Sequence, residues 1–110
     1  MPMLFTIVYD DNHQLRHFFN RFEAYRSKIE KDISERLPTL VSCQSYKIKY
    51  AGKLKHQGRK IEEYKIPLTS SLNCRVAFTV CDRVIKIIYI SDIIRKNSYC
   101  KLLANTNLVD

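Results

Sequence analysis

A continuous pattern over residues 73–99 constrains the fold more than any other stretch of the chain. Residues 74–81 alternate between apolar and mixed side chains, which is the period of a β-strand with one buried face. Residues 84–90 are almost continuously apolar and β-branched, which predicts a central strand buried on both faces. Residues 82–83 between them predict a two-residue turn. The sequence therefore predicts an antiparallel hairpin followed by a basic segment.

Arg75 interrupts the apolar pattern of the first of these strands. It lies on the face opposite Val76 and Phe78, so its guanidinium can point away from the apolar face. A buried charge costs free energy unless its head group reaches solvent or a partner. Two interpretations follow. Arg75 belongs to a functional site, or it forms a cross-strand pair with Glu62 or Glu63.

The first half of the chain predicts a strand followed by a long helix. Residues 3–9 have β-type composition, and Asp11 with Gln14 resembles a helix-capping box. Apolar side chains then recur every three or four residues, which is typical of an amphipathic helix, until Pro38 ends it. The helix would span about 26 residues, which is long for a globular domain, and a break near residues 26–27 would divide it into a helical hairpin.

The rest of the chain predicts further strands and a basic end. Residues 45–50 alternate as a strand, residues 51–60 hold both glycines and predict a flexible basic loop, and residues 61–68 predict another strand. From Asp92, a candidate N-cap, the sequence predicts a short helix or an irregular tail. Together these elements predict a single α+β domain over residues 1–110. Its antiparallel sheet would have four to five strands, with the helix or helical hairpin on one face.

The chain carries a net charge of +8, and the excess is confined to its second half. Residues 10–37 contain six Lys or Arg and six Asp or Glu, whereas residues 45–101 contain thirteen and four. This segregation favours an acidic partner, either nucleic acid or an acidic protein segment. A solvated basic face is the alternative that charge alone leaves open.

Several other chemistries find little support in the sequence. The four cysteines are far apart and favour reduced, buried thiols over a disulfide framework or a zinc site. His13 and His17 have metal-ligand spacing without a third ligand, so we expect neither a metal nor a cofactor. There is no glycine-rich phosphate loop, signal peptide or apolar run of the roughly 18–20 residues that span a membrane. We therefore expect a cytoplasmic protein with no membrane partner.

The remaining polar side chains suit the cleavage of RNA. When the 2′-hydroxyl of RNA attacks the adjacent phosphate, a catalyst must remove a proton, stabilise the phosphorane and protonate the leaving oxygen. Lys and Tyr side chains can move protons, and Arg can hold the phosphorane with two hydrogen bonds, so no metal is required. The same residues can also bind nucleic acid without cutting it, and composition does not separate the two functions.

The second half of the chain resembles the RelE/ParE superfamily of bacterial toxins from type II toxin–antitoxin systems. The resemblance lies in CRVAFTV (74–80), VIKIIYI (84–90) and IIRKNSY (93–99), with GKLK (52–55) and IEEYKI (61–66) upstream, over about 60 residues. It implies a RelE-like fold and a toxin that cleaves mRNA on the ribosome and so inhibits translation. It also implies an acidic antitoxin as partner.

The resemblance assigns roles to individual residues. Arg75 would bind the phosphate, Arg95 would be a second cation, and Tyr99 would stack on a base or transfer a proton. Lys53 and Lys55 would complete the catalytic set. The basic side chains predicted to bind RNA are Lys47, Lys49, His56, Arg59, Lys60 and Lys96.

Each of these assignments has an alternative. Tyr99 could be a packing residue, and Lys53 and Lys55 could be ordinary solvated lysines. The chain also departs from the family pattern, because its helix has no marked break and its loop at residues 51–60 is long and basic. Two other functions therefore stay open: inhibition of DNA gyrase by a toxin of the same fold, and nucleic-acid binding without catalysis.

Overall fold

The computed structural model describes residues 4–110, so the predicted start of the first strand at Met3 lies outside the described part. In chain order the elements are β1 (Thr6–Tyr9), α1 (His13–Arg21), the 3₁₀ turn η1 (Glu23–Tyr25), α2 (Arg26–Glu35), α3 (Leu37–Ser42), β2 (Lys49–His56), β3 (Arg59–Pro67), β4 (Asn73–Cys81), β5 (Val84–Ser91) and α4 (Lys96–Ala104). The predicted α+β class is confirmed, and the predicted hairpin over residues 73–90 is formed by β4 and β5.

The five strands form one sheet in the order β1-β5-β4-β3-β2. β2 to β5 are antiparallel neighbours, but β1 pairs with β5 in parallel. The prediction of a purely antiparallel sheet is therefore wrong, and the sheet is mixed. The physical reason lies in the connection that follows β1. Three helices separate β1 from β2, so no short turn fixes the direction of β1.

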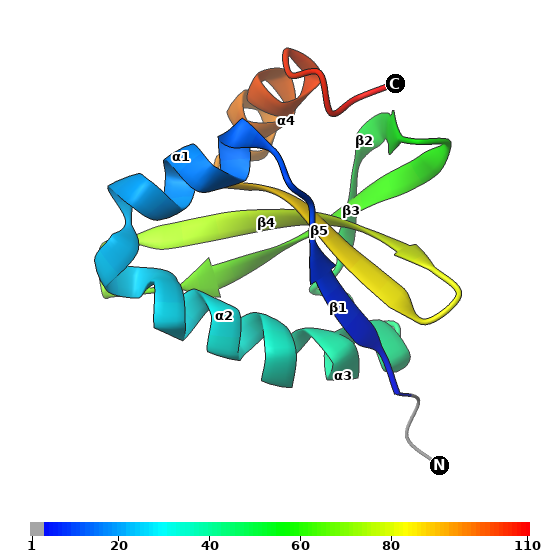
Figure 1. The fold of residues 1–110 in the computed structure, drawn as a ribbon, viewed down its shortest axis with the longest axis horizontal. Coiled ribbons are helices and arrows are strands. Elements are labelled where there is room, and N and C mark those ends of the chain that lie inside the picture. The colour runs from blue at the N-terminus through cyan, green and yellow to red at the C-terminus, as the bar shows by residue number, and fades with distance from the viewer. Residues whose placement is uncertain (1–3) are drawn as a thin grey trace.

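Each face of the sheet is covered by a different set of helices (Figure 1). Buried side chains of α1, α2 and α3, such as Phe18, Ile29 and Leu37, share one core with Phe78 of the sheet. On the opposite face, Tyr99 and Leu103 of α4 share a smaller core with Ala51, Ile61, Ala77, Ile88 and Leu108. The sheet is thus the middle layer, which explains why β4 and β5 are apolar on both faces.

The predicted long helix is divided into shorter ones. α1 ends at Arg21, because the backbone of its C-cap residue Phe22 leaves the helical region with φ −118° and ψ 38°, and η1 connects α1 to α2. Pro38 does not end a helix, since it lies in the first turn of α3, where its missing N–H has no helical acceptor to lose. The N-cap of α1 is Asn12 rather than Asp11, because the Asn12 side chain accepts from the Leu15 amide at 2.8 Å.

Residues 51–60 form a hairpin and not the predicted flexible loop. β2 begins at Lys49, later than the predicted residue 45, and runs to His56. The turn that follows has positive φ at Gln57 (50°) and Gly58 (79°), as two-residue hairpin turns require. The predicted turn at residues 82–83 is confirmed, with φ of 55° at Asp82. Both hairpins, β2–β3 and β4–β5, are therefore ordered parts of the sheet.

The C-terminal segment forms a helix, α4, and not an irregular tail. Arg95 is its N-cap residue and makes no side-chain cap hydrogen bond, so the predicted N-cap at Asp92 is wrong. Asp92 instead lies 3.8 Å from the guanidinium of Arg21 on α1. Within residues 4–110, none of the helices combines the length and apolar character needed to cross a membrane.

Candidate functional site

A pocket of about 490 Å³ opens where β2, β3, β4 and the start of α4 meet. Six of its lining residues are cations and one is a carboxylate. The lining residues are Arg36, Tyr46, Lys47, Lys49, Glu63, Tyr64, Lys65, Pro67, Arg75 and Lys96. This composition makes the pocket the strongest candidate in the described part of the chain for binding an anion.

The strand register places four of these residues on the sheet face that α4 covers. Lys49 of β2 is directly opposite Glu63 of β3, and Lys65 of β3 is directly opposite Arg75 of β4. Glu63 is also opposite Ala77, which packs in the α4 core. Because directly opposed and alternate residues share a face, Lys49, Glu63, Lys65 and Arg75 all line the same surface.

Glu63 is the electrostatic centre of the pocket. Its side chain is fully buried, and its Oε1 accepts a hydrogen bond from Arg75 Nη1 at 2.5 Å. Lys96 Nζ lies 3.9 Å from the same oxygen. Neither Glu63 Oε2 nor Arg75 Nε has a hydrogen-bond partner within residues 4–110. One of the two predicted alternatives for Arg75, the pair with Glu63, is thus present, and Arg75 lines the pocket at the same time.

Tyr99 does not occupy the exposed position that base stacking requires. Its ring is fully buried beneath Arg75, whose guanidinium carbon lies 5.7 Å from the ring centre. Burial raises the pKa of Tyr99 well above its ordinary value, the charge of Glu63 adds to this, and the charge of Arg75 opposes it. A ring without exposed surface cannot stack on a base, and a phenol with this pKa stays protonated. In this structure Tyr99 therefore packs in the core of α4, as its packing alternative predicts, and offers no face to a base.

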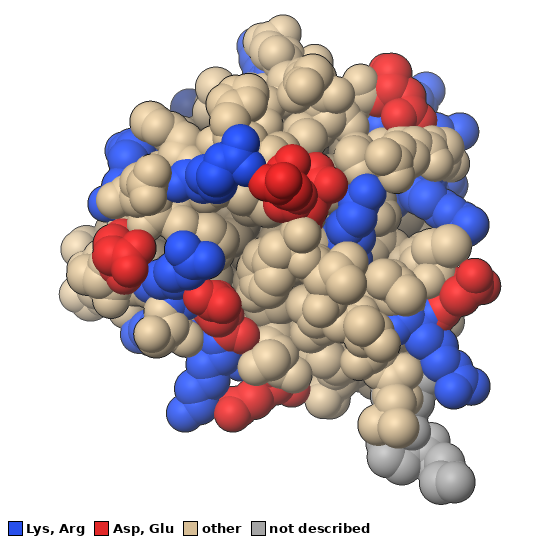
Figure 2. Space-filling view, viewed as in Figure 1, with Lys and Arg blue, Asp and Glu red and all other residues tan. Residues whose placement is uncertain are grey.

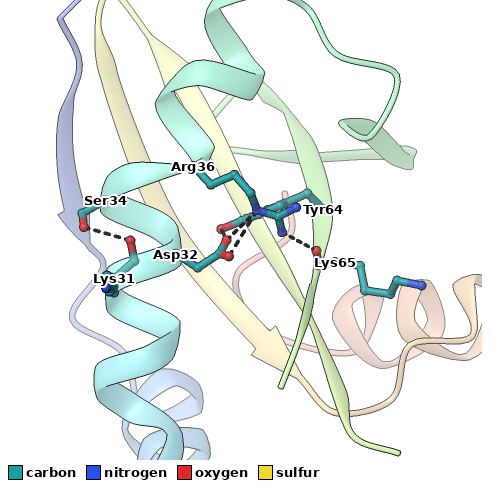
Figure 3. A network of polar contacts seen from close by, with 6 residues as sticks. All are labelled: Lys31, Asp32, Ser34, Arg36, Tyr64 and Lys65. Carbon is teal, nitrogen blue, oxygen red and sulfur yellow. Dashed lines mark hydrogen bonds and ion pairs between the residues drawn. The ribbon is translucent and has the colours of Figure 1, made fainter. Parts of the chain in front are cut away.

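The wall of the pocket at the end of α2 is held by a network of polar contacts (Figure 3). Arg36 donates from Nε to both carboxylate oxygens of Asp32 at 3.1 Å and from Nη2 to the Lys65 carbonyl at 2.9 Å. The Tyr64 hydroxyl donates to Asp32 at 2.9 Å, and Arg36 lies over the Tyr64 ring. Burial, first, and then Asp32 raise the pKa of Tyr64 far above its usual range. The network fixes α2 against β3 and holds Arg36 at the pocket.

Lys53 and Lys55 lie on the other side of β2, away from the pocket. The register between β2 and β3 is irregular between Tyr50 and Lys55, and Gly52 there has φ +57°. The irregularity shifts the alternation by one position, so that Ala51 and then Leu54 contact the α4 core. A one-residue shift turns the intervening side chains to the opposite face. The structure therefore does not bring Lys53 and Lys55 together with Arg75.

The other predicted residues outside the pocket are dispersed. His56 is buried, with Nδ1 2.5 Å from the Leu108 carbonyl, and Arg59 lies opposite it in the register. Lys60 Nζ lies 5.1 Å from the centre of the Tyr50 ring. Arg95 is exposed at the start of α4 but does not line the pocket. Of the predicted residues, the pocket brings together Lys47, Lys49, Arg75 and Lys96.

Sequence reasoning missed six residues that line the pocket: Arg36, Tyr46, Glu63, Tyr64, Lys65 and Pro67. Glu63 was considered only as a pairing partner of Arg75. The i,i+4 spacing of Asp32 and Arg36 was visible as a helix-surface ion pair, but it did not reveal the contact with β3. Strand alternation offered a signal for Lys65, since it places this residue on the same face as Glu63.

The charges are distributed unevenly over the molecule. On the face seen in Figure 2, basic and acidic side chains lie side by side, and ion pairs such as Arg26–Glu30 account for this pattern on the helices. In contrast, no Lys or Arg of residues 47–65 forms an ion pair within the described part of the chain. The unpaired cations thus gather on the β2–β3 hairpin, on both of its faces.

Residues 4–110 contain no arrangement of side chains suited to metal or thiol chemistry. No group of three or more His, Cys, Asp or Glu there is positioned to hold a metal ion. The four cysteines are free, and the prediction of buried thiols holds for Cys74 but not for Cys43, which is exposed. Burial raises the pKa of Cys74 to about 12, with smaller contributions from Asp32 and Asp92. Cys74 is therefore a protonated core residue at neutral pH.

Comparisons of this chain with protein-family models, with curated proteins and with solved structures give no match. The resemblance to the RelE/ParE superfamily therefore rests on the sequence pattern alone.

Proposed function

We propose that this chain is a toxin of the RelE/ParE type that binds single-stranded mRNA in the cationic pocket and cleaves it. The observation that carries the proposal is that six cations and one buried carboxylate line a single pocket. Cations that meet in one concave site match the closely spaced phosphates of RNA. The proposal includes the sequence-based expectations of action on translating ribosomes in the cytoplasm and of inhibition by an acidic antitoxin.

The pocket offers groups for each part of the cleavage reaction. In the proposed step the 2′-oxygen of RNA forms a bond to the adjacent phosphorus while the bond from phosphorus to the 5′-oxygen breaks. The products are a 2′,3′-cyclic phosphate and a 5′-hydroxyl. Arg75 and Lys96 stabilise the negative charge of the phosphorane, and Lys47 and Lys49 hold flanking phosphates.

Glu63 accepts the proton of the 2′-hydroxyl in this proposal. It is the one carboxylate that lines the pocket, and its Oε2 is free to accept a hydrogen bond. Lys96, whose side chain is about half exposed, donates a proton to the leaving 5′-oxygen. Arg75 and Lys96 cover Glu63. The incoming phosphate must therefore draw these two cations toward itself, which uncovers Glu63 as the proton acceptor.

A matched pair of lysines on α4 tests the proposal. Lys96 and Lys101 are both exposed lysines of this helix, but only Lys96 lines the pocket. Purified wild-type protein and both alanine variants are incubated with mRNA, alone and with translating ribosomes. We expect cleavage by wild type and Lys101→Ala, and a loss of about 10²- to 10⁴-fold in Lys96→Ala, which is the usual contribution of a positioned acid. Equal cleavage by both variants would contradict the role of the pocket.

Binding without catalysis is the second candidate, and the closed Glu63–Arg75 pair favours it. In that case wild-type protein retains RNA on a filter and leaves every phosphodiester intact, and Lys96→Ala weakens retention. Cleavage with 2′,3′-cyclic phosphate ends excludes this function. Growth arrest with intact transcripts and DNA damage would instead indicate the gyrase inhibitor, which no contact in the pocket favours.

A further inference from the structure

The exposed face of a tyrosine at the pocket suggests how the RNA base is held. Tyr46 lines the pocket beside Lys47 and Lys49, and 83% of its surface is exposed. No aromatic ring or cation within residues 4–110 packs against the Tyr46 ring. A large ring with free faces beside a row of cations is the arrangement by which proteins bind single-stranded nucleic acid.

The backbone holds Tyr46 in a fixed place. The Lys47 amide donates to the Ser45 hydroxyl at 3.2 Å, and the Ile48 amide donates to the Ser45 carbonyl at 3.1 Å. Ile48 packs against the core of the helical face. Tyr46 therefore lies on a hydrogen-bonded turn with an anchored neighbour, so its backbone is already positioned at the pocket before a ligand orders the ring.

The other exposed tyrosine of this region lacks these features. Tyr50 is 54% exposed, but the Lys60 ammonium covers one face of its ring at 5.1 Å from the centre. It lies one residue out of phase with Lys49 and lines a different hollow, beside Leu40 and Val41. Tyr50 thus serves as a control for the loss of an exposed tyrosine.

We propose that Tyr46 stacks on a nucleobase of single-stranded RNA whose phosphates are held by Lys47, Lys49, Arg75 and Lys96. This inference rests on the proposed function and assigns to Tyr46 the stacking role for which Tyr99 is too deeply buried. Every base has a π-face, so stacking selects unpaired RNA over a duplex without reading sequence. Purines, with the larger face, bind more tightly than pyrimidines at this position.

Removal of a single base from the ligand separates stacking from phosphate binding. Short uncleavable 2′-O-methyl RNA oligonucleotides, with and without an abasic position, are titrated against wild type, Tyr46→Ala, Tyr46→Phe and Tyr50→Ala. We expect Tyr46→Ala to lose roughly 5- to 150-fold in affinity for the complete oligonucleotide and little for one that is abasic at the stacking position. Tyr46→Phe and Tyr50→Ala should bind both ligands as wild type does.

A spectroscopic variant gives an independent readout. The chain contains no tryptophan, so Tyr46→Trp introduces a single reporter ring. Its fluorescence should be quenched by the complete oligonucleotide and not by the one abasic at the stacking position. If wild type binds RNA and Tyr46→Ala keeps the full preference for the complete oligonucleotide, the stacking role is wrong while the proposed function stands. If wild type binds neither oligonucleotide, the proposed function fails as well.

Discussion

At the scale of single residues, the decisive feature is the buried pair of Glu63 and Arg75. A carboxylate with no exposed surface is stable in its charged form only while cations and hydrogen bonds surround it. Arg75 supplies both, and Lys96 adds a second charge at 3.9 Å. The sequence allowed Arg75 to be either a site residue or a pairing residue. In the structure the two alternatives are compatible, because the pairing partner Glu63 lines the same pocket as Arg75.

This pair leads to a prediction about stability. Arg75→Ala strands the Glu63 charge in the interior and should lower the free energy of unfolding by about 3–5 kcal/mol. Lys65→Ala, at the exposed position directly opposite Arg75, should change it by less than about 0.5 kcal/mol. Adding Glu63→Gln to Arg75→Ala should recover part of the loss, since no charge is then buried. Urea denaturation measures all three. An Arg75→Ala protein as stable as Lys65→Ala would show that the pair contributes little.

At the scale of elements, the β2–β3 hairpin decides which cations can act together. The family resemblance placed Lys53 and Lys55 in the catalytic set, but the irregularity near Gly52 turns them to the other face of β2. Such a shift depends on cross-strand pairing, which a single strand's pattern does not contain. The β4–β5 hairpin was predictable, because its apolar alternation and its turn agree. A break in the long helix was expected only as an alternative near residues 26–27, and its place between α1, η1 and α2 was not predictable because neither Gly nor Pro marks it.

The tip of the β2–β3 hairpin is held by the end of the chain. The side chain of Asp110 accepts hydrogen bonds from the backbone amides of Gln57 at 2.5 Å and Gly58 at 2.6 Å. The Asp110 amide donates to the Lys55 carbonyl at 2.9 Å. The amide of Gly58, first, and then that of Gln57 lower the pKa of the Asp110 carboxyl, with help from nearby His56. The turn is thereby fixed in its positive-φ conformation.

The hairpin tip should respond to pH. Because the folded-state pKa of Asp110 is lowered, its hydrogen bonds contribute fully above the ordinary aspartate range and are lost as the pH falls through the folded pKa. At neutral pH, Asp110→Asn should therefore speed hydrogen exchange at the Gln57 and Gly58 amides, and the difference from wild type should vanish in acid. The control is Asp11→Asn, because Asp11 is an exposed carboxylate that lies far from Gln57 and Gly58 in the sequence. A difference that persists at low pH would contradict the role of the charge.

At the scale of the whole molecule, ion pairs lie on the helices, whereas unpaired cations within residues 4–110 gather on the β2–β3 hairpin of the sheet. The segregation of charge was predictable from residue counts, because six cations balance six carboxylates over residues 10–37. The pocket itself was not, because it joins Arg36 of the helical half to Lys49, Arg75 and Lys96 of the other half. Such long-range convergence depends on the order of strands in the sheet and on the place of α4. Neither follows from a local pattern.

The central claim is that RNA binds in this pocket, and an NMR titration tests it most directly. Backbone amide shifts are followed while uncleavable 2′-O-methyl single-stranded RNA is added to the whole chain. The account predicts that the largest shifts occur at Lys47, Lys49, Lys65, Arg75 and Lys96, with smaller ones at Lys53 and Lys55 on the opposite face of β2. Shifts centred on Lys53 and Lys55 with unchanged pocket amides, or no shifts at all, would contradict it.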